Sequence, residues 1–305
     1  MIFLLNIVLV DIMPVIVQLG QCGNQIGFEL VDRLWSEGMR DSFFVQKSNG
    51  KSYARSVLVD MEPKVINEIV EKSGGKEWSY SKTAAITAKS GSGNNWSFGY
   101  SILGKRYEES ILQQVRKLTE DADSTSDGFL ILLAMAGGTG SGVGSRVIQA
   151  IRDEYGTSNP IIAHAIWPYA SGEVVVQNYN TLLTLSALNN SSDGIIFHRN
   201  SIINDLLQSR FSLKTVSFND INNYIARELS SVFLPIKDQR GALHKMPIFQ
   251  LASDLCAHPS YKSLSIRSLP QIKDRRSGFL VGVLFLFKMI THYYRVIPTI
   301  CSHDT

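Results

Sequence analysis

The sequence predicts an α/β protein in which a Rossmann-like, mostly parallel sheet is flanked by helices. Apolar runs alternate with amphipathic, helix-like stretches from residue 14 to about residue 233. The apolar runs are short and continuous, as in FLILLAM at 129–135, which is typical of strands buried on both faces of a sheet. The runs are followed by glycines and small polar residues, and ligands bind at these strand ends in such sheets.

Each element follows from one of the two periodicities. Apolar runs predict strands at 14–19, 55–60, 128–135, 160–166 and 193–197. Helical periodicity predicts helices at 21–36, 104–121, 143–155, 173–188, 200–209 and 218–233. From about residue 234 the alternation weakens, because Pro235, Gly241 and Pro247 interrupt it, and no long helix is predicted there.

The composition indicates a globular chain and excludes several classes of function. Of the 305 residues, 44% are hydrophobic and 19% are charged, which is not the composition of a disordered chain. The formal charge of +3 and the lack of a basic patch interleaved with aromatics argue against nucleic acid as a partner. Three widely spaced cysteines argue against a disulfide scaffold and suit a reducing compartment. The six histidines have no metal-ligand spacing.

Two apolar terminal stretches are not expected to cross a membrane. Residues 1–12 lack the basic start and the cleavage site of a signal peptide, and Met13 stands just before the first predicted strand. We expect this stretch to be an extension rather than a targeting segment. Residues 278–290 are interrupted by Lys288 and are shorter than the roughly 20 residues of a membrane span.

The strongest chemical signal is the glycine-rich loop AGGTGSG at 136–142. It joins a predicted strand to a predicted helix, an arrangement that offers backbone N–H groups and a helix N-terminus to a phosphate. Val143 stands where a Walker loop has its lysine, and the glycine spacing does not match G-x-G-x-x-G. The loop predicts phosphate binding without either common signature, and an ordinary glycine-rich connection is the alternative.

Polar loops follow other predicted strands, and each also allows a structural interpretation. Gln21 and Gln25 open the helix after the first strand, where they contact a nucleotide or belong to a capped helix start. Asp60 and Glu62 follow the second strand, where a carboxylate holds Mg²⁺ through water or favours a helix N-terminus. Residues 89–96 offer small polar groups to a phosphate or form a surface loop.

The later helix starts carry side chains suited to a nucleoside. Glu173 and Gln177 are one helical turn apart, so both can face a ribose or, alternatively, solvent. Phe218 and Asn222 share a helix face, where the ring can stack on a base while the amide reads its edge. A core phenylalanine beside a capping asparagine gives the same pattern. Placement after successive parallel strands predicts that these groups form one site.

The motifs together resemble the tubulin family. The stretch 136–142 is similar to the glycine-rich signature of that family, and 20–25, 60–63 and 91–96 look like its first three nucleotide loops. The stretches 17–29, 57–67, 166–169 and 172–180 resemble the delta-type members in particular. The resemblance runs from Met13 to about Leu269.

This resemblance implies a bound guanine nucleotide, GTP or GDP, together with Mg²⁺. Residues beside phosphate, ribose and base are then Gln21, Cys22 and Gln25. Phosphate contacts are implied for Asn95, Gly137, Gly138, Thr139, Gly140, Ser141 and Gly142, and Mg²⁺ contacts for Glu62 and Gln21. Ribose contacts are implied for Glu173 and Gln177, and guanine contacts for Asn200, Phe218 and Asn222. Gln177 replaces the acid that is usual in alpha and beta members.

The resemblance also implies a domain organisation. We expect an extension at 1–12, a GTP-binding domain at 13–233 with the core helix 218–233, a partial second (intermediate) domain at 234–275, and a divergent tail at 276–305. The chain is thus expected to be a C-terminally truncated or aberrantly terminated family member. The family's second domain covers the last predicted helix, so its apolar stripe is expected to be largely exposed here. The residues of that stripe are Ile221, Ile225, Leu229 and Val232.

The function implied is that of a GTP-binding cytoskeletal protein associated with centrioles, basal bodies and cilium assembly. Its expected location is the cytoplasm and also the nucleus, with other tubulins and centriolar or ciliary proteins as partners. The family hydrolyses GTP with an acidic group from the next subunit, but residues 239–259 offer no assignable acid, so no catalytic residue is predicted. The alternatives are an NAD-dependent oxidoreductase, which needs the missing dinucleotide spacing, and a non-functional tubulin fragment.

Overall fold

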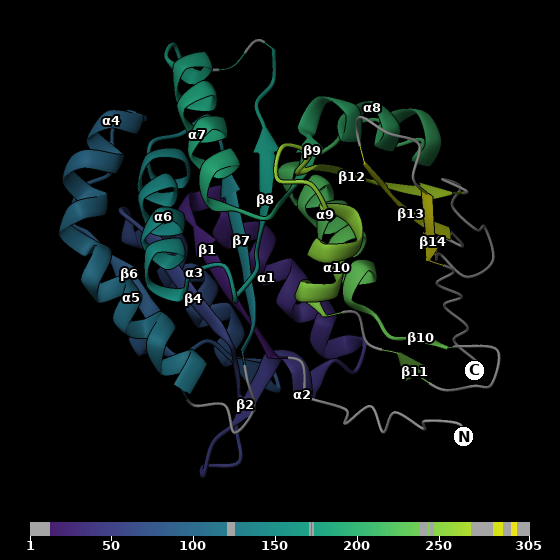
Figure 1. The fold of residues 1–305 in the computed structure, drawn as a ribbon, viewed down its shortest axis with the longest axis horizontal. Helices are drawn as coiled ribbons and strands as arrows, with labels where there is room; N and C mark the ends of the chain where they lie inside the picture. The colour runs from purple at the N-terminus through teal and green to yellow at the C-terminus, as the bar shows by residue number, and fades with distance from the viewer. Residues whose placement is uncertain are drawn as a thin grey trace.

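A single large sheet forms the centre of the molecule (Figure 1). The computed structural model describes residues 13–120, 126–170, 172, 174–237, 243–244, 247–269, 283–288 and 294–297. In this part of the chain the strand order of the large sheet is β14-β13-β12-β9-β8-β7-β1-β4-β6. Every neighbouring pair from β12 to β6 is parallel, and β13 and β14 add to the β12 edge in antiparallel fashion. The predicted α/β class with a mostly parallel sheet is confirmed.

The predicted strands are confirmed with shifts of at most two residues at either end. The parallel strands are β1 (Met13–Leu19), β4 (Ser56–Asp60), β6 (Ala85–Thr87), β7 (Ser126–Ala134), β8 (Ile161–Trp167), β9 (Gly194–Arg199) and β12 (Ser263–Leu269). The antiparallel strands are β13 (Val283–Lys288) and β14 (Tyr294–Ile297). Two smaller sheets hold β2 (Phe44–Gln46), β3 (Ser52–Ala54) and β5 (Trp78–Ser79), and β10 (Ile236–Lys237) and β11 (Leu243–His244).

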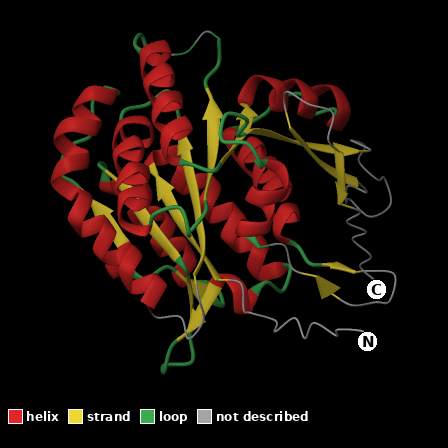
Figure 2. Cartoon of the chain, in the orientation of Figure 1, coloured by secondary structure: helices red, strands yellow, loops and turns green. Residues whose placement is uncertain are grey.

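The helices cover both faces of the sheet (Figure 2). They are α1 (Gly20–Ser36), α2 (Arg40–Phe43), α3 (Pro63–Gly74), α4 (Trp96–Phe98), α5 (Lys105–Glu120), α6 (Gly144–Tyr155), α7 (Gln177–Ser191), α8 (Asn200–Phe211), α9 (Phe218–Phe233) and α10 (Ile248–Leu255). Among these helices, none has the length and hydropathy that a membrane crossing requires.

One predicted helix start is wrong. The helix predicted from residue 173 begins at Gln177, because the valines that precede it form a turn instead. The Gln177 N–H donates to the Val174 carbonyl at 3.0 Å, and the Asn180 N–H donates to the Val176 carbonyl at 3.0 Å. Consecutive β-branched residues weaken helix propensity, which is consistent with this late start.

Several elements were not predicted. Helix α3 is absent from the predicted helices, but it follows Glu62 directly and has Pro63 in its first turn, which agrees with the alternative interpretation of Glu62 as a charge at a helix N-terminus. Strand β12 alternates apolar and polar residues, and its Leu264 and Ile266 are buried. It lies in the stretch assigned to a partial second domain, yet it pairs with β9 in the large sheet. The domain division itself stays a prediction, and residues 1–12 lie outside the described residues.

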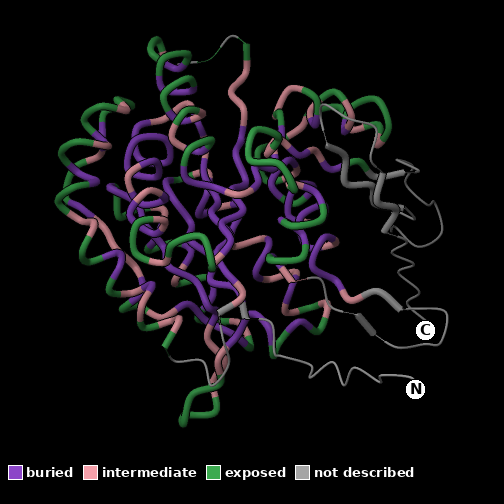
Figure 3. The backbone as a smooth tube through the Cα atoms, viewed as in Figure 1, coloured by how far each residue is buried: buried purple, intermediate pink, exposed green. Residues whose placement is uncertain are grey.

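The core lies on both sides of the sheet (Figure 3). Along β7, Leu130 and Leu132 pack in one apolar cluster with α1, α9 and α10, whereas Phe129 and Ile131 pack in a second cluster with α5 and α6. Successive side chains of a strand point to opposite faces, so a strand covered on both faces is apolar at every position. This arrangement explains the continuous apolar runs of the sequence.

The apolar stripe of α9 is buried, which corrects the expectation that it would be exposed. Its four residues are no more than 2% exposed and belong to the cluster that contains α1 and α10. Helix α9 packs closely along α1, and it also contacts α8, β12 and β13. The stripe therefore faces the sheet and its neighbouring helices within this chain.

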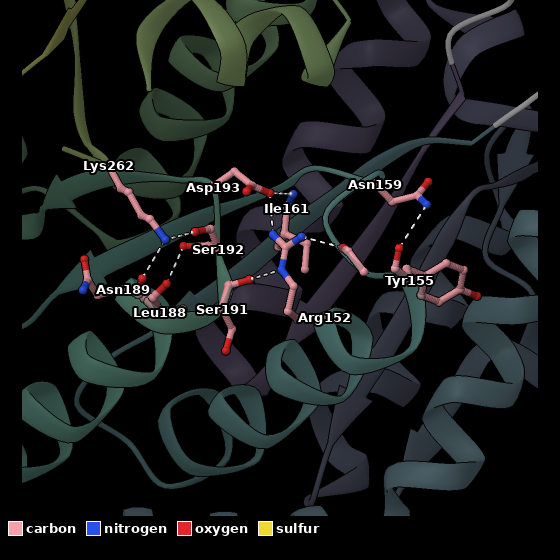
Figure 4. A network of polar contacts seen from close by, with 11 residues as sticks. Arg152, Tyr155, Asn159, Ile161, Leu188, Asn189, Ser191, Ser192, Asp193 and Lys262 are labelled. Atoms are coloured by element: carbon pink, nitrogen blue, oxygen red, sulfur yellow. Dashed lines mark hydrogen bonds and ion pairs between the residues drawn. The ribbon is translucent and has the colours of Figure 1, made fainter. Parts of the chain in front are cut away.

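A polar network ties the ends of α6 and α7 to the starts of β8, β9 and β12 (Figure 4). Arg152 of α6 pairs with Asp193, whose carboxylate also accepts the Ile161 N–H at 2.7 Å. The Lys262 ammonium donates to the carbonyls of Asn189 and Ser192, each at 2.7 Å. A cation at the carbonyl end of a helix is favourable, and here it fixes the start of β12 beside β9.

Candidate nucleotide-binding site

A cavity of about 680 Å³ lies at the carboxyl ends of the parallel strands. It brings together polar groups from the loops after β1, β4, β7, β8 and β9 and from the start of α9. The predicted site residues that line it are Gln21, Cys22, Gln25, Glu62, Gly137, Gly138, Thr139, Gly140, Gln177, Asn200, Phe218 and Asn222. Asn95, Ser141 and Gly142 do not line it, and Glu173 lies outside the described residues. The contact roles of all these residues stay predictions.

Two glycine loops meet backbone to backbone in the cavity wall. Gly20 has a φ of +72°, and a Cβ on it would lie 2.8 Å from the Gly140 nitrogen. A Cβ on Gly140 would lie 2.9 Å from the Ala134 carbonyl oxygen. Any side chain at these positions would force the loops apart, so glycine is required here by loop packing.

The remaining glycines of the loop differ in what they face. A Cβ on Gly138 would lie 2.4 Å from the Ser92 hydroxyl oxygen, and one on Gly142 would lie 2.3 Å from the Trp96 carbonyl oxygen. Gly137 has open space, with its nearest atom at 3.7 Å. The buried Ser141 hydroxyl donates to the Gly137 carbonyl, and Ser141 itself does not line the cavity. The glycine-rich sequence therefore serves contact between loops as well as access to the cavity.

Asn180, which is not among the predicted site residues, joins helix α7 to two strand-end loops. Its side chain is 3% exposed. The amide nitrogen donates to the carbonyls of Asn94 at 2.8 Å and Ala136 at 2.7 Å, while the amide oxygen accepts the Trp96 N–H at 3.1 Å. The only available signal was its place in the motif 172–180, one turn after Gln177.

Asn95 has a local structural role. Its side-chain oxygen accepts the Phe98 N–H at 3.1 Å and thereby caps the short helix α4. Capping by asparagine satisfies an N–H that the helix itself leaves without a partner. Asn95 thus shapes the loop that faces the glycine-rich stretch.

Carboxylates gather at one end of the cavity. Asp60 ends β4 and is 4% exposed, and burial raises its pKa to about 6, although the backbone N–H of Glu62 donates to it at 3.4 Å. Glu62 precedes α3, and its carboxylate lies against Gly91. These two acids and Gln21 share the cavity wall, so oxygen ligands of the kind that Mg²⁺ prefers are close together.

The acidic end is not a closed metal cage. Among the described residues, no group of three or more histidine, cysteine, aspartate or glutamate side chains could hold a metal ion. Mg²⁺ usually keeps several waters and takes one or two protein carboxylates together with phosphate oxygens. The donor set here fits that mode of binding. Cys22 is a neutral neighbour, because burial raises the pKa of its thiol to about 12.

Aromatic and amide groups from α9 also line the cavity. Phe218 is 65% exposed at the start of α9, and Asn222 is nearly buried one turn later. The helix start is fixed by Ser217, whose hydroxyl accepts the Asp220 N–H at 3.2 Å. A large exposed ring at the edge of a cavity is available to stack on a planar ligand.

The side chain of Gln177 is held in place by the loop before it. It is 7% exposed, and its amide nitrogen donates to the Tyr169 carbonyl at 3.0 Å. Its amide oxygen lies so close to Gly172 that a Cβ there would clash with it. Gln177 therefore joins the loop after β8 to the start of α7.

Comparison with known proteins identifies the family of this arrangement. Residues 14–208 match the model described as "Tubulin/FtsZ family, GTPase domain". The chain belongs to the Tubulin/FtsZ family. This match covers β1 to α8 and hence nearly all of the loops around the cavity. A GTPase domain of this family implies that the nucleotide is GTP or GDP.

Several curated relatives are tubulin delta chains. The chain is 44% identical over 281 residues to the tubulin delta chain of Canis lupus familiaris, which covers 85% of this chain and 62% of the relative. It is 44% identical over 286 residues to the tubulin delta chain of Homo sapiens, and the match covers 87% of this chain and 63% of that relative. It is 43% identical over 279 residues to the tubulin delta chain of Mus musculus, and the match covers 85% of this chain and 61% of that relative. The chain thus spans less than two thirds of the length of these relatives.

Proposed function

We propose that the cavity binds GTP or GDP together with Mg²⁺. The observation that carries this proposal is the placement of chemically distinct groups around one space. Phe218 and Asn222 line the cavity from α9, which contacts α8. Along the strand order of the sheet, the acids follow β4, the glycine-rich loop follows β7 and Asn200 follows β9. This order matches the order of Mg²⁺, phosphates, ribose and base along a nucleotide.

Each group has a role that its chemistry supports. Glu62 and Asp60, with Gln21, would hold Mg²⁺, and residues Gly137–Gly140 would receive the phosphates through backbone N–H groups. Gln177 faces the ribose, Phe218 stacks on the base, and Asn222 with Asn200 reads its edge. Mg²⁺ supplies charge neutralisation to the phosphates when bound. Hydrolysis has no assigned catalytic residue.

The test measures the affinity of the full chain for GTP, ATP and NAD with fluorescent analogues, and GTP is expected to bind most tightly. Phe218→Ala is compared with Phe249→Ala, because both rings are exposed, at 65% and 61%, but Phe249 lies on α10 and does not line the cavity. Loss of base stacking costs about 1–3 kcal/mol, so Phe218→Ala is expected to weaken GTP about 5- to 150-fold. Equal affinities for the two variants, or preferential binding of NAD, contradict the proposal.

We also propose a cytoskeletal role at centrioles, basal bodies and cilia, with other tubulins as partners. The support is the similarity to tubulin delta chains and the resemblance of several motifs to delta-type members. Cells that express the tagged chain are expected to show it at centrioles or ciliary bases. A uniform distribution in ciliated cells, with normally folded protein, contradicts this role.

A further inference from the structure

Strands β9 and β12 separate from each other after a short paired region. Ser263 pairs with Ile195 and Leu264 with Ile196, and in the described part of the chain their pairing ends there. Strand β9 continues to Arg199 along β8, while β12 continues to Leu269 along β13. We use the name β9–β12 wedge for the space between residues Phe197–Arg199 of β9 and residues Ser265–Arg267 of β12.

A cavity of about 390 Å³ occupies this wedge. Its size lies in the range of roughly 300–1,000 Å³ that is typical of small-molecule sites. Strand β8, helices α7, α8 and α9, and both strands of the wedge contribute to its wall. None of its lining residues also lines the candidate nucleotide cavity. It is therefore a separate site among the described residues.

The wall is largely apolar and includes the aromatic rings of Trp167, Phe197 and Tyr224. Trp167 and Phe197 pack edge to face with ring centroids 6.0 Å apart, and Ile203 and Leu206 of α8 face the same space. Such a surface favours an apolar or aromatic molecule, because burial removes its apolar area from water.

Buried polar side chains form a fixed inner part of the wedge. The Glu228 carboxylate is 4% exposed, lies 2.9 Å from His198 Nε2 and accepts the Tyr224 hydroxyl at 2.8 Å. The other nitrogen of His198 lies 2.8 Å from His164 Nε2. Helices and strands thus hold these groups in one orientation, and Glu228 is engaged by groups of the protein itself.

The exposed charges of the wedge are positive. Arg199 and Arg267 both line the cavity and are both exposed. Neither forms an ion pair within 4.0 Å in the described residues, and the Arg199 guanidinium lies 5.6 Å from the centroid of the Trp167 ring. Guanidinium groups in such a position bind carboxylate, sulfonate or phosphate groups.

We propose that the β9–β12 wedge is a second small-molecule site, which takes a molecule with an aromatic or apolar body and one anionic group. The body contacts Trp167, Phe197 and the α8 side chains. The anionic group meets Arg199 and Arg267 at the opening. The residues that carry this proposal do not line the nucleotide cavity.

The test uses 8-anilinonaphthalene-1-sulfonate, an aromatic sulfonate whose fluorescence rises on binding. Titrations are made on the full chain with saturating GTP and Mg²⁺, at low and at high salt. We expect one saturable site. Arg267→Glu is expected to weaken it about 5- to 10-fold at low salt and less at high salt, because salt screens exposed charges. Ser265→Trp fills the wedge and is expected to abolish binding.

Matched controls place the same changes outside the wedge. Arg210→Glu reverses an exposed charge on α8, and Ser253→Trp adds a ring to the exposed face of α10; neither residue lines the cavity. Both controls are expected to bind the probe like the parent chain. Unchanged binding in both wedge variants, or binding that does not saturate, overturns the proposal.

Discussion

Replacement of Asn180 by aspartate tests how the strand-end loops are held around the candidate nucleotide cavity. Two carbonyl oxygens, of Asn94 and Ala136, lie 2.7–2.8 Å from the side-chain nitrogen, and one N–H, of Trp96, points at the side-chain oxygen. An ionised carboxylate of the same shape would place a negative oxygen against both carbonyls. The folded protein is therefore expected to hold the introduced carboxyl group in its protonated form.

The magnitude follows from the pKa of that acid. If the folded state keeps it protonated at pH 7, while the unfolded state titrates near pH 3.9, the cost is about 1.4 kcal/mol for each of about three pH units, or roughly 4 kcal/mol. A protonated acid donates to one carbonyl only, so a further cost of about 1 kcal/mol is expected for the lost hydrogen bond. The sum is a large part of the roughly 5–15 kcal/mol that stabilises a typical domain.

The sign of the pH dependence separates this explanation from simple loss of packing. A folded-state pKa above the unfolded value gives stability that is present at low pH and lost as pH rises. The deficit of Asn180→Asp relative to the parent chain is thus expected to shrink by about 2.7 kcal/mol between pH 7 and pH 5. Asn180→Ala cannot titrate, and its deficit of about 3 kcal/mol, from three lost hydrogen bonds, is expected to stay constant.

Urea unfolding of the parent chain and both variants at pH 5, 6 and 7 measures these differences. Nucleotide affinity measured on the same samples reports whether the loops keep their arrangement. A deficit of Asn180→Asp that is constant with pH, or that grows toward pH 5, would refute the reasoning, because the carboxylate would then be ionised in the fold.

Three further outcomes are expected. Gly142→Ala should destabilise the chain by about 1–3 kcal/mol in urea unfolding, because the new Cβ would lie 2.3 Å from the Trp96 carbonyl oxygen. Gly137→Ala should leave stability within about 0.5 kcal/mol of the parent, because its Cβ would lie 3.7 Å from the Asn94 side-chain oxygen, an ordinary contact. Asp127 accepts the Ile248 N–H at 2.7 Å, and burial raises the pKa of its carboxyl group to about 6. The parent chain should therefore lose stability from pH 4 to pH 6 more steeply than Asp127→Asn, and parallel pH profiles of the two would contradict this. Lys262→Met should lower the unfolding free energy by about 1–2 kcal/mol, because it removes two charge-assisted hydrogen bonds to carbonyls. An unchanged urea midpoint would argue that water replaces these hydrogen bonds.

The sequence was sufficient for the elements whose periodicity is strong. Strands β7 and β8 are apolar on both faces, and α9 begins and ends at the predicted residues, with its start fixed by the Ser217–Asp220 capping box. Strand β12 is absent from the predicted strands because four of its seven residues are polar and its partner β9 is far away in the chain. Local pattern carries no information about such a distant partner.

The candidate site shows the same limit. Strand-end loops were identified because parallel strands end at one edge, so the residues after them converge. The role of Asn180 depends on carbonyls from two other loops, which no local spacing reveals. Likewise, burial of the α9 stripe depends on its packing along α1, and the sequence showed only that the stripe was apolar.

The junction between β9 and α8 has a consequence for any binding measurement. Arg199 lines the β9–β12 wedge, whereas the next residue, Asn200, lines the candidate nucleotide cavity. Helix α9 likewise presents Asn222 to one cavity and Glu228 to the other. Occupants of the two cavities therefore act on the same backbone segments. Any free-energy coupling between them must be equal in both directions, so an affinity measured at one cavity has meaning only at a stated occupancy of the other.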